Sequence, residues 1–285
     1  MSINPPPEII NVAEDGLLKK AYTPFGATFI SAMYAGAMIA VGFVFFTTSQ
    51  MGITDQTWVG LTKVIGGIVF STGLALVVMT GSDLFTSTSM TLIPGCEGKL
   101  PWSRLLQHWG VVYVGNFVGS VLIAILVFLG GLPAGYKGAW GATVMNIATA
   151  KVSHPFFEAL VLGIMCNFMV CLAVWMTFAG KSVADKILGL TMPIALFVAS
   201  GFEHSVANMF MIPLGLIVKG QGDPAIIEAT GKAIGEFDGL TIGTFLINNL
   251  LPVTIGNIIG GGVFVGLGMW LWHRRLANTA QKVAN

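Results

Sequence analysis

The sequence contains little charge. Only 9% of its 285 residues are Asp, Glu, Lys or Arg, and 54% are hydrophobic, whereas an ordinary soluble domain has about 25% charged residues. The formal net charge is +1, so no large field suggests a nucleic acid or an acidic protein as a partner. This composition excludes a typical soluble domain and indicates a membrane protein.

Motifs for cofactors, metals and disulfides are also absent from the sequence. The three cysteines Cys96, Cys166 and Cys171 form neither a CxxC pair nor a disulfide framework, so we interpret them as packing thiols. No GxxxxGK[ST] loop occurs, which argues against an ATP-driven pump. We therefore expect no cofactor, no metal site and no enzymatic activity.

The first residues do not resemble a cleaved signal peptide. The stretch MSINPPPEIINVAEDG is acidic and contains prolines, without a basic head that leads directly into an apolar core. Residues 1–25 are instead expected to form a cytoplasmic amphipathic segment. Its short helix is predicted to lie on the inner membrane surface or against the cytoplasmic mouth, because its apolar residues recur at helical spacing: Ile9, Ile10, Ala13, Leu17 and Leu18.

Long apolar runs fill the rest of the chain. Crossing a bilayer takes about 20 such residues as a helix, and six runs meet that length: Gly26–Thr48, Val64–Ile93, His108–Gly130, Phe156–Gly180, Ile187–Val218 and Phe245–Trp272. The sequence thus predicts an all-α membrane protein with a transmembrane domain over residues 26–273 and a cytoplasmic tail over residues 274–285.

The distribution of basic residues predicts the orientation in the membrane. With the N-terminus in the cytoplasm, nine basic residues lie inside and five outside, which favours both termini inside. The inside set is Lys19, Lys20, Lys99, Arg104, Lys181, Lys186, Arg274, Arg275 and Lys282, and the outside set is Lys63, Lys137, Lys151, Lys219 and Lys232.

Two matched pairs of motifs indicate an internal duplication. VVMTGSDLFTSTSM in the second run and FVASGFEHSVANMF in the fifth both interrupt an apolar helix with a glycine and then a carboxylate, Asp83 or Glu203. The runs that follow contain GNFVG and GNIIG. Three crossings per half would insert the second copy upside down, as an inverted 3+3 repeat over about residues 26–130 and 156–272. The interrupted second and fifth helices should then face each other across a pathway.

The polar residues near the two interruptions are candidates for the pathway. A helix break in a bilayer must be buried or line a wet cavity, and Asp83 and Glu203 are suited to accept hydrogen bonds from the freed amides. His204 can change its charge near neutral pH and is a candidate proton partner. Asn116 is expected to tie helices together, while for Asn257 both a structural tie and a pore role stay open.

Bulky apolar residues flank both interruptions. A pathway that they constrict would exclude hydrated ions. These residues are Phe70, Leu74, Leu84, Phe85 and Phe197. An anion would pass such a constriction more easily after becoming neutral.

Four stretches carry a resemblance to a known family. The chain resembles the formate–nitrite transporter family over essentially its whole length in GSDLFTSTSM, ASGFEHSVANMFMIPLG, CNFMVCLAVWM and PVTIGNIIGGG. GFEHS, where nitrite members tend to have GYEHS, favours the formate branch. The resemblance implies an aquaporin-like protomer with its own pore, a homopentamer, and a bacterial inner membrane.

The same resemblance implies roles for individual residues. The central histidine and its acidic neighbour fall on His204 and Glu203, and the constriction falls on the five bulky residues named above. The polar pore residues fall on Thr86, Lys151, Asn167, Asn208 and Asn257.

The mechanism expected from this resemblance begins with Lys151, which draws in formate or a similar small anion. Near His204 the anion either passes with the imidazolium as counter-charge or takes a proton and crosses as the neutral acid.

Three other functions are alternatives to formate transport. A nitrite or hydrosulfide channel of the same family is the main alternative. A neutral-solute channel is weaker, because the paired NPA tripeptides expected at the interruptions are missing. A membrane enzyme that uses Glu203 and His204 as an acid–base pair is weaker still, because no nucleophile accompanies them.

Overall fold

The computed structural model describes residues 3–52 and 56–276. Its helices are α1 (Pro6–Ala21), α2 (Phe25–Ser49), η1 (Gln56–Trp58), α3 (Val59–Thr80), α4 (Phe85–Thr88), η2 (Ser89–Thr91), α5 (Leu92–Cys96), α6 (Trp102–Leu129), η3 (Leu132–Ala134), α7 (Ala139–Val152), α8 (Phe156–Ala179), α9 (Val183–Ala199), α10 (Ser205–Gln221), α11 (Pro224–Thr230), η4 (Ile234–Phe237), α12 (Ile242–Thr244), η5 (Phe245–Leu250), α13 (Leu251–Asn257), η6 (Ile258–Leu267), α14 (Gly268–Trp270) and η7 (Leu271–Leu276). The all-helical fold is as predicted.

Long apolar helices make up most of the fold. In the described chain α2, α3, α6, α8 and a helical run within Ile234–Leu276 are long and apolar enough to cross a membrane. The fifth predicted crossing is divided between α9 and α10, which have 17 residues each. The count of six crossings therefore stays a prediction.

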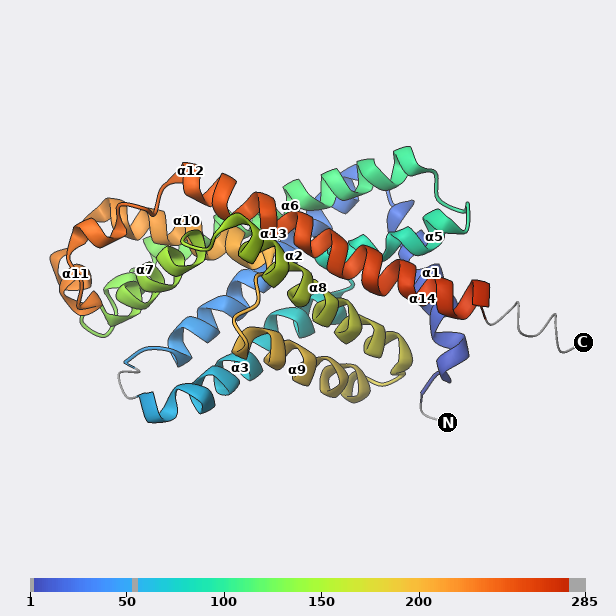
Figure 1. Cartoon of the computed structure of the whole chain (residues 1–285), viewed down its shortest axis with the longest axis horizontal. Helices are drawn as coiled ribbons and strands as arrows, with labels where there is room; N and C mark the ends of the chain where they lie inside the picture. The colour runs from blue at the N-terminus through green and yellow to red at the C-terminus, as the bar shows by residue number, and fades with distance from the viewer. Residues whose placement is uncertain (1–2, 53–55, 277–285) are drawn as a thin grey trace, which may run out of the picture.

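The two halves of the chain pack in matching pairs. α2 packs against α6 as α8 packs against α13, and α3 lies beside α9 (Figure 1). The repeated glycines permit the close approach: a Cβ on Gly119 would overlap the Met33 carbonyl, and one on Gly260 the Ile164 carbonyl. The small-residue spacing thus serves helix packing, as expected.

The N-terminal helix α1 packs against the rest of the protein, on α8, η2 and α5. Its predicted place, on the inner membrane surface or against the cytoplasmic mouth, stays a prediction. Its Glu14 is 2% exposed and pairs with Lys99 Nζ at 2.6 Å and Arg274 Nη2 at 2.7 Å. α1 and α14 lie at the same end of the molecule (Figure 1). The predicted tail reaches the described chain only through Arg274, Arg275 and Leu276, and its remaining residues lie outside the described part.

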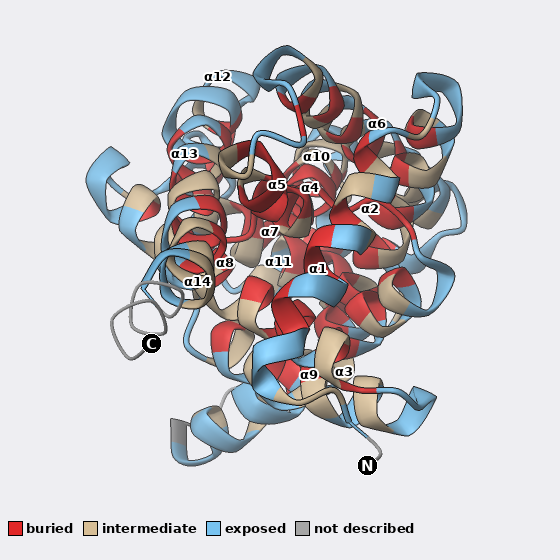
Figure 2. Cartoon of the chain, turned by 90° about the vertical axis from the view of Figure 1, so that its right-hand side faces the viewer, coloured by how far each residue is buried: buried red, intermediate tan, exposed pale blue. Residues whose placement is uncertain are grey.

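One helix lies in a segment for which the sequence predicts no membrane crossing. The segment between the third and fourth crossings contains α7, whose 14 residues pack on α10 and α11. Lys151 therefore lies in the last turn of α7, before the start of α8 at Phe156. Figure 2 shows buried residues gathered around α4, α7 and α10, between outer helices that carry the exposed ones.

Candidate functional site

Two helix interruptions meet near the centre of the fold. The first break comprises residues 81–84, between α3 and α4, and the second break comprises residues 200–204, between α9 and α10. Gly81 has φ +71° and Gly201 has φ +74°. Glycine populates this left-handed conformation readily, whereas other residues do so with strain, which explains a glycine at the same place in both breaks.

An asparagine from the repeated GNxxG motif holds each break. Asn257 Oδ1 accepts the Ser205 N–H at 2.9 Å, and its Nδ2 donates to the carbonyls of Gly163 and Glu203. Asn116 makes the same three bonds in the first half, to the Phe85 N–H and the carbonyls of Ala32 and Asp83. These asparagines satisfy backbone groups that the breaks leave free.

Replacing Asn257 with alanine should destabilise the protein through the second break. Three buried backbone groups would lose their partner, and each such loss costs about 1–3 kcal/mol. Thermal unfolding in detergent measures the effect. Asn146→Ala is the control, because Asn146 Oδ1 has no partner in the described chain; equal shifts for the two variants would contradict the role of Asn257.

His204 caps the helix that follows the second break. Its Nδ1 accepts the Ala207 N–H at 3.1 Å, and its Nε2 lies 3.3 Å from Oγ1 of Thr86 in α4, directly after the first break. Because Nδ1 is an acceptor, the proton of the ring lies on Nε2 and points toward Thr86. The residue is 2% exposed. The Nε2–H group of His204 thus lies where the second break approaches α4.

A cluster of polar side chains surrounds Glu203. Lys151 Nζ lies 2.7 Å from Glu203 Oε1, while Asn208 and Asn249 donate to Oε2 at 2.7 and 3.0 Å. Asn249 also donates to the Lys151 carbonyl at 2.8 Å. A buried carboxylate needs such partners. Asn249 was missed in the sequence, although two adjacent asparagines at 248–249 interrupt an apolar run.

The first break has a matching ion pair that the sequence analysis also missed. Lys20 Nζ of α1 lies 3.7 Å from Asp83 Oδ1 and donates to the Ser82 carbonyl at 2.7 Å. Lys20 and Lys151 each stand four residues before a Pro-Phe pair, in KAYTPF and KVSHPF. This shared spacing could have identified Lys20 as the counterpart of Lys151, and it relates the end of α1 to the end of α7.

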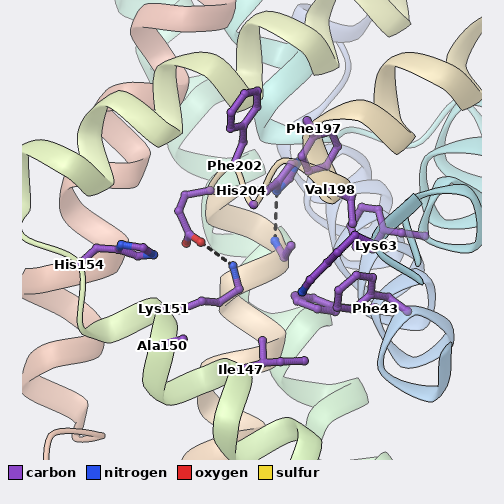
Figure 3. Close-up of a pocket in the computed structure, with 15 residues that line it drawn as sticks. Phe43, Lys63, Ile147, Ala150, Lys151, His154, Phe197, Val198, Phe202 and His204 are labelled. Atoms are coloured by element: carbon purple, nitrogen blue, oxygen red, sulfur yellow. Dashed lines mark hydrogen bonds and ion pairs between the residues drawn. The ribbon is translucent and has the colours of Figure 1, made fainter. Parts of the chain in front are cut away.

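A cavity of about 210 Å³ leads to His204. Phenylalanines line much of it, and Figure 3 shows Lys151, Lys63 and His204 around it. The rings of Phe70 and Phe197 meet edge to face at 5.8 Å, and Phe197 stacks on His204 at 6.0 Å. Of the predicted constriction, these two rings line the cavity. Leu74, Leu84 and Phe85 are buried and lie outside its lining.

Asn167 connects the two halves. Its Nδ2 donates to the carbonyls of Thr86 and Asn257 at 3.0 and 2.6 Å. The structure therefore brings Thr86, Lys151, Glu203 and Asn208 together around His204, while Asn167 and Asn257 bond mainly to backbone. Whether each of them contacts a permeant solute stays a prediction.

Comparison with known proteins gives a consistent result. A family profile described as "Formate/nitrite transporter" matches residues 7–271. Formate channel FocA of Escherichia coli (strain K12) is 45% identical over 270 residues, which cover 95% of this chain and 94% of that protein. FocA of Haemophilus influenzae is also 45% identical, over 92% of each chain.

Solved structures agree with this result. One described as "Pentameric formate channel with formate bound" superposes with a TM-score of 0.82 at 43% identity, covering 90% of this chain and 98% of that one. An "FNT family ion channel" superposes with a TM-score of 0.75 at 29% identity, covering 93% and 98%. The matched breaks, the capped histidine and these similarities together show that the chain belongs to the formate/nitrite transporter family.

Proposed function

We propose that this protein is a formate channel. The observation that carries the proposal is the N–H of His204 Nε2, held beside Thr86 at the end of a phenylalanine-lined cavity that also contains Lys63 and Lys151. A buried donor in apolar surroundings suits a small oxyanion. The relatives named formate channels support formate over nitrite or hydrosulfide.

The anion is proposed to take up a proton beside His204 and to cross as formic acid. A charged group in apolar surroundings is costly, and the Phe70–Phe197 contact leaves little room for a hydrated ion. Nε2 is the ring atom that faces the solute. A neutral ring that gave up its Nε2 proton would become an imidazolate, so Nδ1 takes up a proton from water as Nε2 passes its own proton to formate, and the ring is neutral before and after the step. An imidazolium that persisted would leave Nδ1 without the bond from the Ala207 amide. This geometry favours the neutral-acid route over passage with an imidazolium counter-charge.

The remaining features of the proposal concern assembly and location. We propose a homopentamer in a bacterial inner membrane with both termini in the cytoplasm, from the pentameric relative and from the excess of basic residues predicted inside. Six crossings in an inverted 3+3 repeat agree with the matching bonds of Asn116 and Asn257. The predicted site residues act along the path of each protomer.

Flux through purified protein in liposomes tests the function. Formate should enter faster than through protein-free liposomes, whereas water permeability should be unchanged. Nitrite or hydrosulfide flux that exceeds formate flux would favour that branch of the family. Water flux without anion flux would overturn the proposal and indicate a neutral-solute channel.

A further inference from the structure

The cavity that leads to His204 is lined by an ion pair whose charges cancel. Lys151 lies 2.7 Å from Glu203, and the two side chains are only 14% and 3% exposed. An approaching anion therefore meets a neutral pair rather than a free cation, because the carboxylate offsets the ammonium at short range. Lys151 alone does not explain how an anion is drawn in.

A second lysine at the same cavity has no such partner among the residues that the structure describes. Lys63, in the first turns of α3, lines the cavity from the side opposite Lys151 (Figure 3). In the described part of the chain, no carboxylate lies within 4 Å of its Nζ. The ammonium instead lies 5.9 Å from the centre of the Phe46 ring. A ring holds a cation in place without cancelling its charge.

Lys63 also borders a second, larger cavity. This outer cavity, of about 400 Å³, is lined by polar side chains that include Gln50, Thr62, Thr143 and Asn146. Lys63 and Ile147 are the two residues that line both cavities. An anion that moves directly from the outer cavity into the cavity at His204 passes Lys63 and Ile147.

A continuous row of aromatic rings begins at Phe46, beside Lys63, and ends at His204. Phe46 contacts Phe43 at 5.3 Å between ring centres, Phe43 contacts Phe70 at 5.6 Å, and Phe70 contacts Phe197 at 5.8 Å. Lys151 Nζ lies 5.9 Å from the Phe43 ring, so Lys63 and Lys151 stand over neighbouring rings. The two cations mark successive positions on one path.

We propose that Lys63 is the residue that captures the small carboxylate anion where the two cavities meet, before the anion reaches Lys151 and His204. Its ammonium, which no carboxylate of the described residues neutralises, supplies positive charge to the path and up to three N–H donors on a flexible stem. This inference rests on the proposed function, since it assigns the first binding position of the same anion.

The test measures initial formate flux against formate concentration, at low and at high ionic strength, in proteoliposomes. Lys63→Met keeps the apolar stem and removes the charge. We expect a roughly three- to tenfold higher half-saturating formate concentration at low ionic strength, because a charged cleft concentrates its counter-ion. The maximal flux should change little, and the salt dependence should largely vanish. Lys63→Arg should stay close to the original protein.

Lys232→Met is the matched control. Lys232 Nζ lies 5.8 Å from the Phe237 ring and lines neither cavity, so its loss removes the same charge from a similar contact. An unchanged half-saturating concentration in Lys63→Met, or an equal change in Lys232→Met, would overturn the inference. Absence of formate flux in the original protein would instead refute the proposed function.

Discussion

Replacing His204 with asparagine should remove the pH-dependent part of formate flux while the protein stays folded. Asparagine is a good N-cap, so its side-chain oxygen can accept the Ala207 N–H that His204 Nδ1 accepts now. It has no group that exchanges a proton near neutral pH. A group that transfers a proton contributes about 10²-fold or more, and we expect a loss of that order.

His204→Phe completes the comparison. Phenylalanine loses the cap as well as Nε2, which should lower stability by about 1 kcal/mol more than asparagine does. Uptake measured from outside pH 5 to 8, together with thermal unfolding, separates the two contributions. Proton-coupled uptake that survives in the asparagine variant would show that His204 only caps α10.

Breaking the ion pair between Lys151 and Glu203 should cause a large loss of stability. Glu203→Gln would leave a mostly buried ammonium without its carboxylate, and Lys151→Met would leave a buried carboxylate without its ammonium. Removal of one partner of a buried pair typically costs about 3–5 kcal/mol. The midpoint of thermal unfolding should fall by on the order of 10 °C in each variant.

The double variant with both substitutions should recover part of the loss, because no uncompensated charge remains. Glu158→Gln is the matched control: Glu158 Oε1 also lies 2.7 Å from its partner, His154 Nδ1, but its side chain is 54% exposed. That substitution should change stability by no more than about 1 kcal/mol. Additive losses in the Lys151 and Glu203 variants would show that the pair contributes no coupling.

The sequence predicted the features that repeat along the chain. Apolar length predicted the long apolar helices, among them α2, α3, α6 and α8, and the paired glycine-carboxylate interruptions predicted the breaks, because each signal lies within one segment. Asn116 and Asn257 hydrogen-bond to the backbone of the breaks, and the GNxxG repeat had identified both asparagines as candidates. The two interruptions were expected to face each other, and the structure brings His204 Nε2 within 3.3 Å of Thr86 Oγ1. The capping bond of His204 to Ala207 depends on the local turn and was not predicted.

Contacts between distant segments were harder to predict. Helix α7 has 14 residues and packs on α10. It is too short to cross a bilayer, so a search for long apolar runs left these residues in the connection between the third and fourth crossings. Asn249 acquires its role only when the last long helix brings it against Glu203. Lys63 was counted among the basic residues on the outer side of the membrane, and its position between two cavities follows only from how α2, α3 and α7 pack together.

The central claim is that formate crosses as the neutral acid. One measurement tests it most directly: formate uptake into proteoliposomes, with internal pH and membrane current recorded together over outside pH 5 to 8. We expect electroneutral uptake with a matching internal acidification, because formic acid releases its proton after it crosses. Current that accompanies formate uptake without a pH change would contradict it and show that the anion passes with its charge.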